Sequence, residues 1–190
     1  MNKALFLDRD GVLDALIRHQ NGEWGAPLGP DQVTLLPGVI DALRLAREHG
    51  WLIFVVSNQP DAAKGKTTIE SLRAAHQRLL ELLGGAPITE FFYCHHRTED
   101  RCSCRKPEPF FVLEAARRHD VELTRSWFVG DTDTDIETGH RAGCRTALVE
   151  YPYSSSRRGA QRPDRVCRDL GHFVQTLTAQ TSVHDTRSRD

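Results

Sequence analysis

Three short apolar runs in the sequence are each followed by acidic or hydroxyl-bearing residues. Asp8 and Asp10 follow the first run, Ser57 follows the second, and Asp131 follows a later one. Ligands of open parallel sheets bind beyond the carboxyl ends of the strands, so these side chains are expected to meet in one crevice. Clustered carboxylates repel one another unless a cation neutralises them, and oxygen-only ligands favour Mg²⁺. The pattern therefore predicts a magnesium site.

Such a site suits phosphoryl transfer, in which charge neutralisation and positioning supply most of the catalysis. The sequence contains no Walker-type glycine-rich loop for a nucleotide. We therefore predict that Asp8 is a nucleophile that forms an aspartyl phosphate. Asp10, two residues further on, can act first as general acid and then as general base. Gly11 is expected to let the chain turn sharply beside the phosphate.

The elements that must position these residues alternate along the chain. Non-alternating apolar runs predict buried strands over residues 4–7, 52–56, 91–93, 127–129 and 146–149. Helical periodicity predicts helices over residues 39–49, 67–83, 110–120 and 135–142. Residues 152–163 have loop composition, and residues 166–178 are expected to add a last strand and helix. This alternation is typical of a doubly wound α/β fold with a mainly parallel sheet.

The chain length of 190 residues favours one domain, which we place at residues 1–179. The polar segment 180–190 is expected to be a disordered tail. The segment between Asp10 and Ser57 is too short for a cap domain. We therefore expect a capless, open site whose specificity comes from short loops.

Composition excludes several classes of partner. Lys and Arg number 25 against 26 Asp and Glu, a formal net charge of -1, so a basic field for nucleic acid or an anionic membrane is not expected. No apolar run approaches the ~20 residues of a membrane-spanning helix, and the N-terminus lacks the pattern of a signal peptide. We expect a cytoplasmic protein that binds a small phosphorylated substrate. A monomer is the default, since no exposed apolar helix face is evident.

Three of the five cysteines lie close together in the sequence with two histidines. Cys94 directly precedes His95 and His96, and Cys102 and Cys104 follow a short loop. Cysteine and histidine donors in this number fit a closed, tetrahedral and therefore structural Zn²⁺ site. His96 matches the one-residue spacing better than His95, and the choice between them stays open. The other two cysteines are expected to pack in the interior.

The sequence resembles the haloacid dehalogenase superfamily of phosphohydrolases through four motifs. They are Asp8-Arg9-Asp10-Gly11-Val12, Ser57-Asn58-Gln59, Lys106-Pro107 and Gly130-Asp131-x-x-x-Asp135. The resemblance implies a Rossmann-like core, and it implies the following roles. The nucleophile is Asp8 and the acid/base Asp10; the phosphate or substrate ligands are Ser57, Asn58, Arg105 and Lys106; the Mg²⁺ ligands are Asp8, the Asp10 carbonyl and Asp131, with Asp135 supporting the metal's waters. Asp133 is expected to cap the next helix or to face solvent.

The zinc loop narrows the resemblance to the D-glycero-D-manno-heptose 1,7-bisphosphate phosphatase subfamily. Because Arg105 and Lys106 follow Cys104 directly, a zinc-stapled loop would hold both cations at the mouth of the crevice. The chain departs from the subfamily at His95, where proline is common, in residues 60–65, and at Thr132, where lysine is common. These departures bear on the sugar contacts more than on the phosphatase chemistry.

Two alternatives remain from the sequence. Histidinol-phosphate phosphatases share the same motifs. A catalytically silent, zinc-stabilised binding module could use the same fold, since a fold alone guarantees no activity.

Overall fold

The structure of the chain, a computed structural model, describes residues 1–186. Its centre is a six-stranded, fully parallel sheet in the order β5-β4-β1-β6-β7-β8. The strands are β1 (Lys3–Leu7), β4 (Trp51–Asn58), β5 (Glu90–Cys94), β6 (Trp127–Gly130), β7 (Arg145–Val149) and β8 (Arg165–Cys167). Every strand predicted from the sequence is present, and the doubly wound α/β fold is confirmed.

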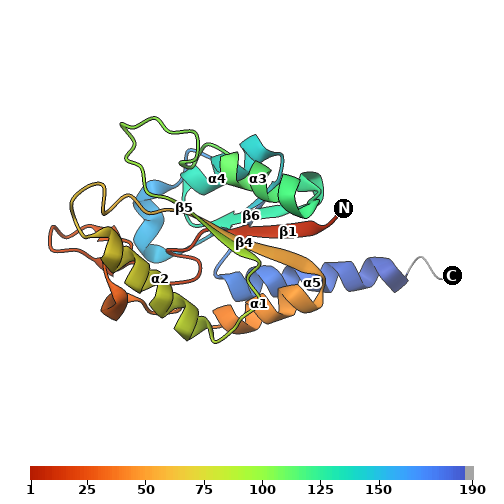
Figure 1. The fold of residues 1–190 in the computed structure, drawn as a ribbon. Coiled ribbons are helices and arrows are strands. Elements are labelled where there is room, and N and C mark those ends of the chain that lie inside the picture. The colour runs from red at the N-terminus through yellow and green to blue at the C-terminus, as the bar shows by residue number, and fades with distance from the viewer. Residues whose placement is uncertain (187–190) are drawn as a thin grey trace.

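Helices cover both faces of this sheet (Figure 1). One face carries α1 (Val39–Glu48), α2 (Ile69–Leu83) and α5 (Leu170–Thr186), and the other carries α3 (Phe110–His119) and α4 (Asp133–Ala142). The core is accordingly divided into two clusters of buried side chains, one on each face of the sheet.

Strand β1 shows why the buried strands read as continuous apolar runs. Leu5 and Leu7 pack into the core under α1 and α5, whereas Ala4 and Phe6 point to the opposite face. All four side chains are 0% exposed. Because successive residues of a strand point to opposite faces, a strand covered on both sides must be apolar at every position.

Helix α4 begins two residues earlier than predicted. Thr132 is its N-cap residue and forms a capping box with Asp135, so the first turn includes Asp133. Asp133 therefore does not cap this helix, and its side chain is half-buried, so the other alternative, that it faces solvent, is met only in part. Its carboxylate instead accepts hydrogen bonds from three backbone N–H groups of residues 159–161.

Several short elements were not predicted. Strands β2 (Ile17–Arg18) and β3 (Trp24–Gly25) form an antiparallel hairpin after β1. Three 3₁₀ helices are η1 (Pro30–Gln32), η2 (Leu123–Arg125) and η3 (Pro152–Arg157), the last within the predicted loop. Helix α5 also continues through residues 180–186, which the sequence assigned to a disordered tail, because no proline or glycine interrupts the turn-by-turn propagation of the helix there. Residues 187–190 of that predicted tail lie outside the described residues.

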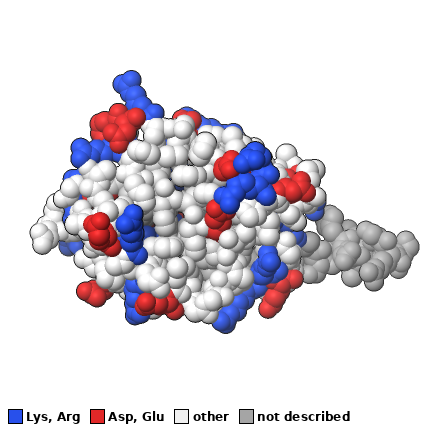
Figure 2. All heavy atoms as spheres, in the orientation of Figure 1, with Lys and Arg blue, Asp and Glu red and all other residues white. Residues whose placement is uncertain are grey.

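The region between β1 and α1 contains the hairpin β2–β3 and η1. Within residues 1–186 this hairpin is the only sheet besides the central one, so the expected capless architecture is present. No helix of the described residues is long and apolar enough to cross a membrane. On the face shown in Figure 2, basic side chains lie beside acidic ones rather than in one field, consistent with the net charge of -1.

Candidate active site

Three carboxylates converge at the carboxyl ends of the central strands. Asp8 directly follows β1, Asp131 directly follows β6, and Asp135 lies in the first turn of α4. Oxygen atoms of these three side chains all lie within 4.8 Å of one another. The Asp131 carboxylate lies close to the backbone of Gly11. Gly11 has φ +87, and a Cβ atom at this position would lie 2.3 Å from an Asp131 oxygen. Any side chain at residue 11 would displace Asp131, so the expected sharp turn at Gly11 is confirmed and also leaves room for a carboxylate.

The electrostatics of this group call for a cation. Burial and the neighbouring carboxylates raise the pKa of Asp8 to about 6 and the pKa of Asp131 to about 8. Neither oxygen of Asp131 has a hydrogen-bond donor, although the side chain is buried. The nearby Ser154 hydroxyl donates instead to the Tyr151 carbonyl oxygen. Unpartnered buried carboxylate oxygens fit a hard divalent cation such as Mg²⁺.

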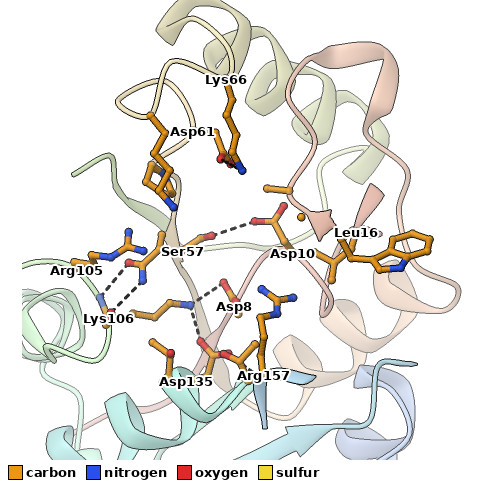
Figure 3. Close-up of a pocket in the computed structure, with 18 residues that line it drawn as sticks. Asp8, Asp10, Leu16, Ser57, Asp61, Lys66, Arg105, Lys106, Asp135 and Arg157 are labelled. Atoms are coloured by element: carbon orange, nitrogen blue, oxygen red, sulfur yellow. Dashed lines mark hydrogen bonds and ion pairs between the residues drawn. The ribbon is translucent and has the colours of Figure 1, made fainter. Parts of the chain in front are cut away.

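Lys106 brings a buried positive charge to the same carboxylates. Its Nζ atom lies 2.8 Å from Asp8 Oδ1 and 2.7 Å from Asp135 Oδ1, as Figure 3 shows. Burial alone favours the neutral amine, but Asp135 and Asp8 raise the pKa of Lys106 above its usual range. The lysine is therefore fixed as a cation beside Asp8, where a phosphate would bind.

Asn58 holds the backbone of Lys106. Its Nδ2 donates to the Lys106 carbonyl oxygen at 3.1 Å, and its Oδ1 accepts from the Lys106 N–H at 3.0 Å. Both ends of the amide are thus used within the protein. Asn58 lines the cleft as predicted, but the structure gives its polar atoms a positioning contact with Lys106.

Asp10 is held on the other side of the cleft by Ser57 and Gln59. Gln59 Nε2 donates to Asp10 Oδ2 at 2.5 Å, and the Ser57 hydroxyl lies 3.4 Å from the same oxygen. The other oxygen, Oδ1, lies 3.4 Å from the guanidinium of Arg9, which is itself paired with Asp14. Asp10 is therefore oriented through both of its oxygens.

Gln59 is 1% exposed, and sequence reasoning did not select it as a site residue. Its backbone joins the active site to the cysteine loop, because the Gln59 N–H donates to the Cys94 carbonyl and the Gln59 carbonyl lies 3.2 Å from His95 Nδ1. The only sequence signal was its place in the Ser57-Asn58-Gln59 motif. The contact of Gln59 with Asp10 depends on the pairing of β1 with β4, so it could not be predicted from the sequence.

The cysteine cluster forms a compact group of four donors. Cys94 Sγ lies 3.6 Å from Cys102 Sγ and 3.5 Å from Cys104 Sγ. His96 Nδ1 lies 3.6 Å from Cys94 Sγ and 3.4 Å from Cys104 Sγ. The structure therefore groups His96, rather than His95, with the thiols. Burial raises the pKa of Cys94 to about 12, which a bound Zn²⁺ would reverse by holding the thiolate.

Residues at the carboxyl ends of β1, β4 and β6 line one cleft of about 530 Å³ (Figure 3). Arg105 lines it as predicted, and its Nη1 donates to the His96 carbonyl oxygen at 3.1 Å. Trp24 of the hairpin and Arg157 of η3 are among the lining residues that come from segments with no predicted role. Trp24 and Arg157 lie in one cleft only because segments more than one hundred positions apart pack together, and no local sequence pattern predicts that packing.

Known proteins share this arrangement. A model of the HAD-hydrolase-like family matches residues 103–173. The D-glycero-beta-D-manno-heptose-1,7-bisphosphate 7-phosphatase of Bordetella bronchiseptica is 31% identical over 92% of this chain and 97% of its own length. The D-glycero-D-manno-heptose-1,7-bisphosphate 7-phosphatase of Thermosynechococcus vestitus is 33% identical over 92% of this chain and 94% of its own. The chain belongs to this phosphatase family of the haloacid dehalogenase superfamily.

The fold agrees with a solved member of the family. The crystal structure of D,D-heptose 1,7-bisphosphate phosphatase from B. bronchiseptica, complexed with magnesium and phosphate, matches with a TM-score of 0.81 and 30% identity. The match covers 94% of this chain and 99% of that one. The chain is therefore a phosphatase, a hydrolase of phosphoric monoesters, and phosphatases of this superfamily use Mg²⁺.

Proposed function

We propose that this phosphatase removes the 7-phosphate from D-glycero-D-manno-heptose 1,7-bisphosphate through an aspartyl phosphate at Asp8. The observation that carries the proposal is the convergence of Asp8, Asp131 and Asp135 within 4.8 Å around two unpartnered oxygens of Asp131. The named relatives supply the choice of sugar, because their similarity extends over 92% of the chain.

Asp8 Oδ2 is the oxygen we assign to the attack on phosphorus. The other oxygen, Oδ1, already accepts from the Arg9 N–H at 2.7 Å and from Lys106 at 2.8 Å. Attack forms the bond between Oδ2 and phosphorus and breaks the bond between phosphorus and the sugar oxygen. Asp10 gives its proton to that leaving oxygen.

Hydrolysis of the aspartyl phosphate uses the same groups in reverse. Asp10, now a carboxylate, takes a proton from a water molecule that attacks phosphorus, and Asp8 leaves as the free carboxylate. Lys106 and the Ser57 hydroxyl hold the phosphoryl oxygens during both steps. When bound by Asp8, Asp131 and the Asp10 carbonyl, with Asp135 supporting its waters, Mg²⁺ would supply further neutralisation of phosphate charge.

We also propose that Cys94, His96, Cys102 and Cys104 bind a structural Zn²⁺. Four protein donors leave no open position for a substrate, so this site serves the loop rather than the chemistry. The loop leads directly into Arg105 and Lys106, and Asn58 and Gln59 tie its two sides to the active site.

The test of the catalytic assignment is a pair of conservative variants. Asp8→Asn is expected to abolish turnover and Asp10→Asn to leave a trace, while both keep the wild-type melting temperature within a few degrees. Incubation with beryllium fluoride and Mg²⁺ should label wild-type protein at Asp8 with one equivalent. Undiminished activity of Asp8→Asn would rule out the covalent mechanism.

The sugar is tested separately with a substrate panel. We expect kcat/KM for the heptose bisphosphate to exceed that for histidinol phosphate and for p-nitrophenyl phosphate by at least about 100-fold, since added charged contacts contribute about 1.5–3 kcal/mol each. A preference for histidinol phosphate would refute the assigned sugar and leave the phosphatase chemistry intact. Absence of turnover on every member would favour the silent binding module.

A further inference from the structure

Arg157 stands at the metal end of the cleft without a hydrogen bond to hold its guanidinium. Its Nη2 atom lies 3.7 Å from Asp131 Oδ2, an ion pair longer than a hydrogen bond. The Arg157 side chain is 46% exposed, whereas that of Asp131 is 1% exposed. Figure 3 shows Arg157 beside Asp8, across the cleft from Arg105. The arginine is thus a movable cation next to a buried carboxylate.

The backbone around Arg157 is fixed, in contrast to its side chain. The Asp133 carboxylate accepts from the N–H groups of Gly159, Ala160 and Gln161 at 3.1, 2.8 and 3.0 Å. These three bonds dock the segment that follows η3 onto the start of α4. Arg157 is therefore delivered to the cleft at a defined place.

The hairpin β2–β3 holds η3 from the other side. The rings of Trp24 and Tyr153 stack with centroids 3.7 Å apart and planes 12° apart. Trp24 lines the same cleft as Arg157. The wall that carries Arg157 is thus built from two segments that support each other.

Of the four other cations that line the cleft, Lys66, Arg105 and Lys106 have closer partners, and Lys64 is exposed to solvent. Lys106 lies within 2.8 Å of two carboxylates, and Lys66 pairs with Asp61 at 3.3 Å. The partner of Arg157 is Asp131, whose two oxygens accept no hydrogen bond. A divalent cation at Asp131 neutralises that partner and repels the guanidinium over a few ångströms.

We propose that Arg157 links the metal to the substrate's second phosphate. It pairs with Asp131 in the metal-free protein, and when a divalent cation takes Asp131 it turns into the cleft and binds the phosphate that is not transferred. A guanidinium can bind a phosphate through two parallel hydrogen bonds, which suits a remote dianion. This inference rests on the magnesium site and the bisphosphate substrate of the proposed function.

Linkage makes the proposal measurable without turnover, since a residue that competes with the metal and aids the anion must affect both affinities. The first measurement is binding of Mn²⁺ alone, followed by the EPR signal of the free ion. We expect Arg157→Gln to bind Mn²⁺ about threefold to fivefold more tightly than wild type, the range that a partly exposed ion pair supports. Arg162→Gln removes the same charge from a nearby exposed residue and should bind as wild type does.

The second measurement is calorimetric binding of the product, heptose 1-phosphate, which keeps only the remote phosphate. Addition of Mg²⁺ should tighten the binding of heptose 1-phosphate to wild type by about tenfold, which is the gain expected from one charge-assisted hydrogen bond. Arg157→Gln should show no such gain, and Arg157→Lys should recover part of it.

The outcomes separate this inference from the function on which it rests. Equal Mn²⁺ affinities of wild type and Arg157→Gln, or an unchanged gain in product affinity in that variant, would overturn the role of Arg157. Mn²⁺ binding that survives Asp131→Asn unchanged would instead overturn the proposed metal site. Tighter Mn²⁺ binding together with a lost gain in product affinity supports the proposal.

Discussion

At the scale of single residues, Asn58 shows how a side chain can serve a phosphate that it does not contact. Its amide satisfies both the N–H and the carbonyl group of Lys106. This pairing resembles the hydrogen-bonded pair of an antiparallel ladder, in which two residues exchange both bonds, and it fixes where the Lys106 side chain begins. The Nζ atom can then reach Asp8 and Asp135 together.

Asn58→Ala is expected to lower kcat by about tenfold and the free energy of unfolding by about 1–3 kcal/mol, because two backbone polar groups lose their partners. Steady-state kinetics and thermal melts measure the two effects. Gln20→Ala, at an exposed position of the hairpin loop, is the matched control and should change neither. A variant with normal kcat but reduced stability would show that Lys106 does not depend on Asn58 for its position.

Residue types were the part of the site that the sequence predicted well. Carboxylates and a hydroxyl at strand ends, with a lysine directly after the cysteine loop, indicated phosphate chemistry, and these residues do lie together. Gln59 and Arg157 were not predicted, because an amide and an arginine have many structural uses. Their contacts with Asp10 and Asp131 exist only once distant segments pack.

At the scale of elements, the cysteine loop is the clearest case of one segment positioning another. It runs from the end of β5 to Lys106, and its four donor atoms all lie within 4.8 Å of one another. Without a metal, the thiols and His96 would have only weak sulfur contacts to hold the loop.

Cys102→Ser is therefore expected to lose bound zinc and to lower kcat/KM by about tenfold or more, although no cysteine contacts the substrate. Elemental analysis should find about one zinc per wild-type chain after desalting and much less in the variant. Ser103→Ala, the exposed residue between two of the cysteines, should keep both zinc and activity. If wild-type protein that is purified under reducing conditions contains no zinc, the proposed zinc site is wrong.

The long elements of the fold were predictable and the short ones were not. A buried strand such as β4 is predicted by its apolar run. Helix α2 is predicted by the helical period of its apolar residues and by Gly84 at its end. The hairpin β2–β3 has two residues in each strand, too few for any period. Residues 152–163 are rich in serine and arginine, a loop-like composition, and the 3₁₀ turns at Pro152–Arg157 lie next to residues 159–161, which bond to Asp133.

At the scale of the whole molecule, the buried carboxylates make stability depend on pH. In the metal-free protein burial raises the pKa of Asp8 to about 6 and of Asp131 to about 8, both from 3.8. The folded state therefore binds these protons more tightly than the unfolded state. By linkage, these two groups destabilise the fold progressively as pH rises above about 4, where they ionise in the unfolded chain, until pH passes about 8, where Asp131 ionises in the folded protein as well.

Mg²⁺ is accordingly expected to raise the melting temperature more at pH 8 than at pH 6, because it stabilises the ionised carboxylates. Each kcal/mol corresponds to about 2–4 °C for a protein of this size. Thermal melts with and without Mg²⁺ at the two pH values measure the difference. Asp131→Asn removes one of the two titrating groups and should flatten the pH dependence, whereas an equal Mg²⁺ effect at both pH values would contradict this account.

The central place of β1 sets the order in which the protein can assemble during synthesis. This strand is translated before both of its neighbours, which begin at Trp51 and Trp127. At about 5–20 residues per second, an apolar strand that carries the nucleophile stays unpaired on its second edge for roughly 10 s. The nascent chain thus exposes an aggregation-prone segment for most of its translation. Lower expression temperatures and a chaperone that binds β1 should therefore increase the yield of folded enzyme.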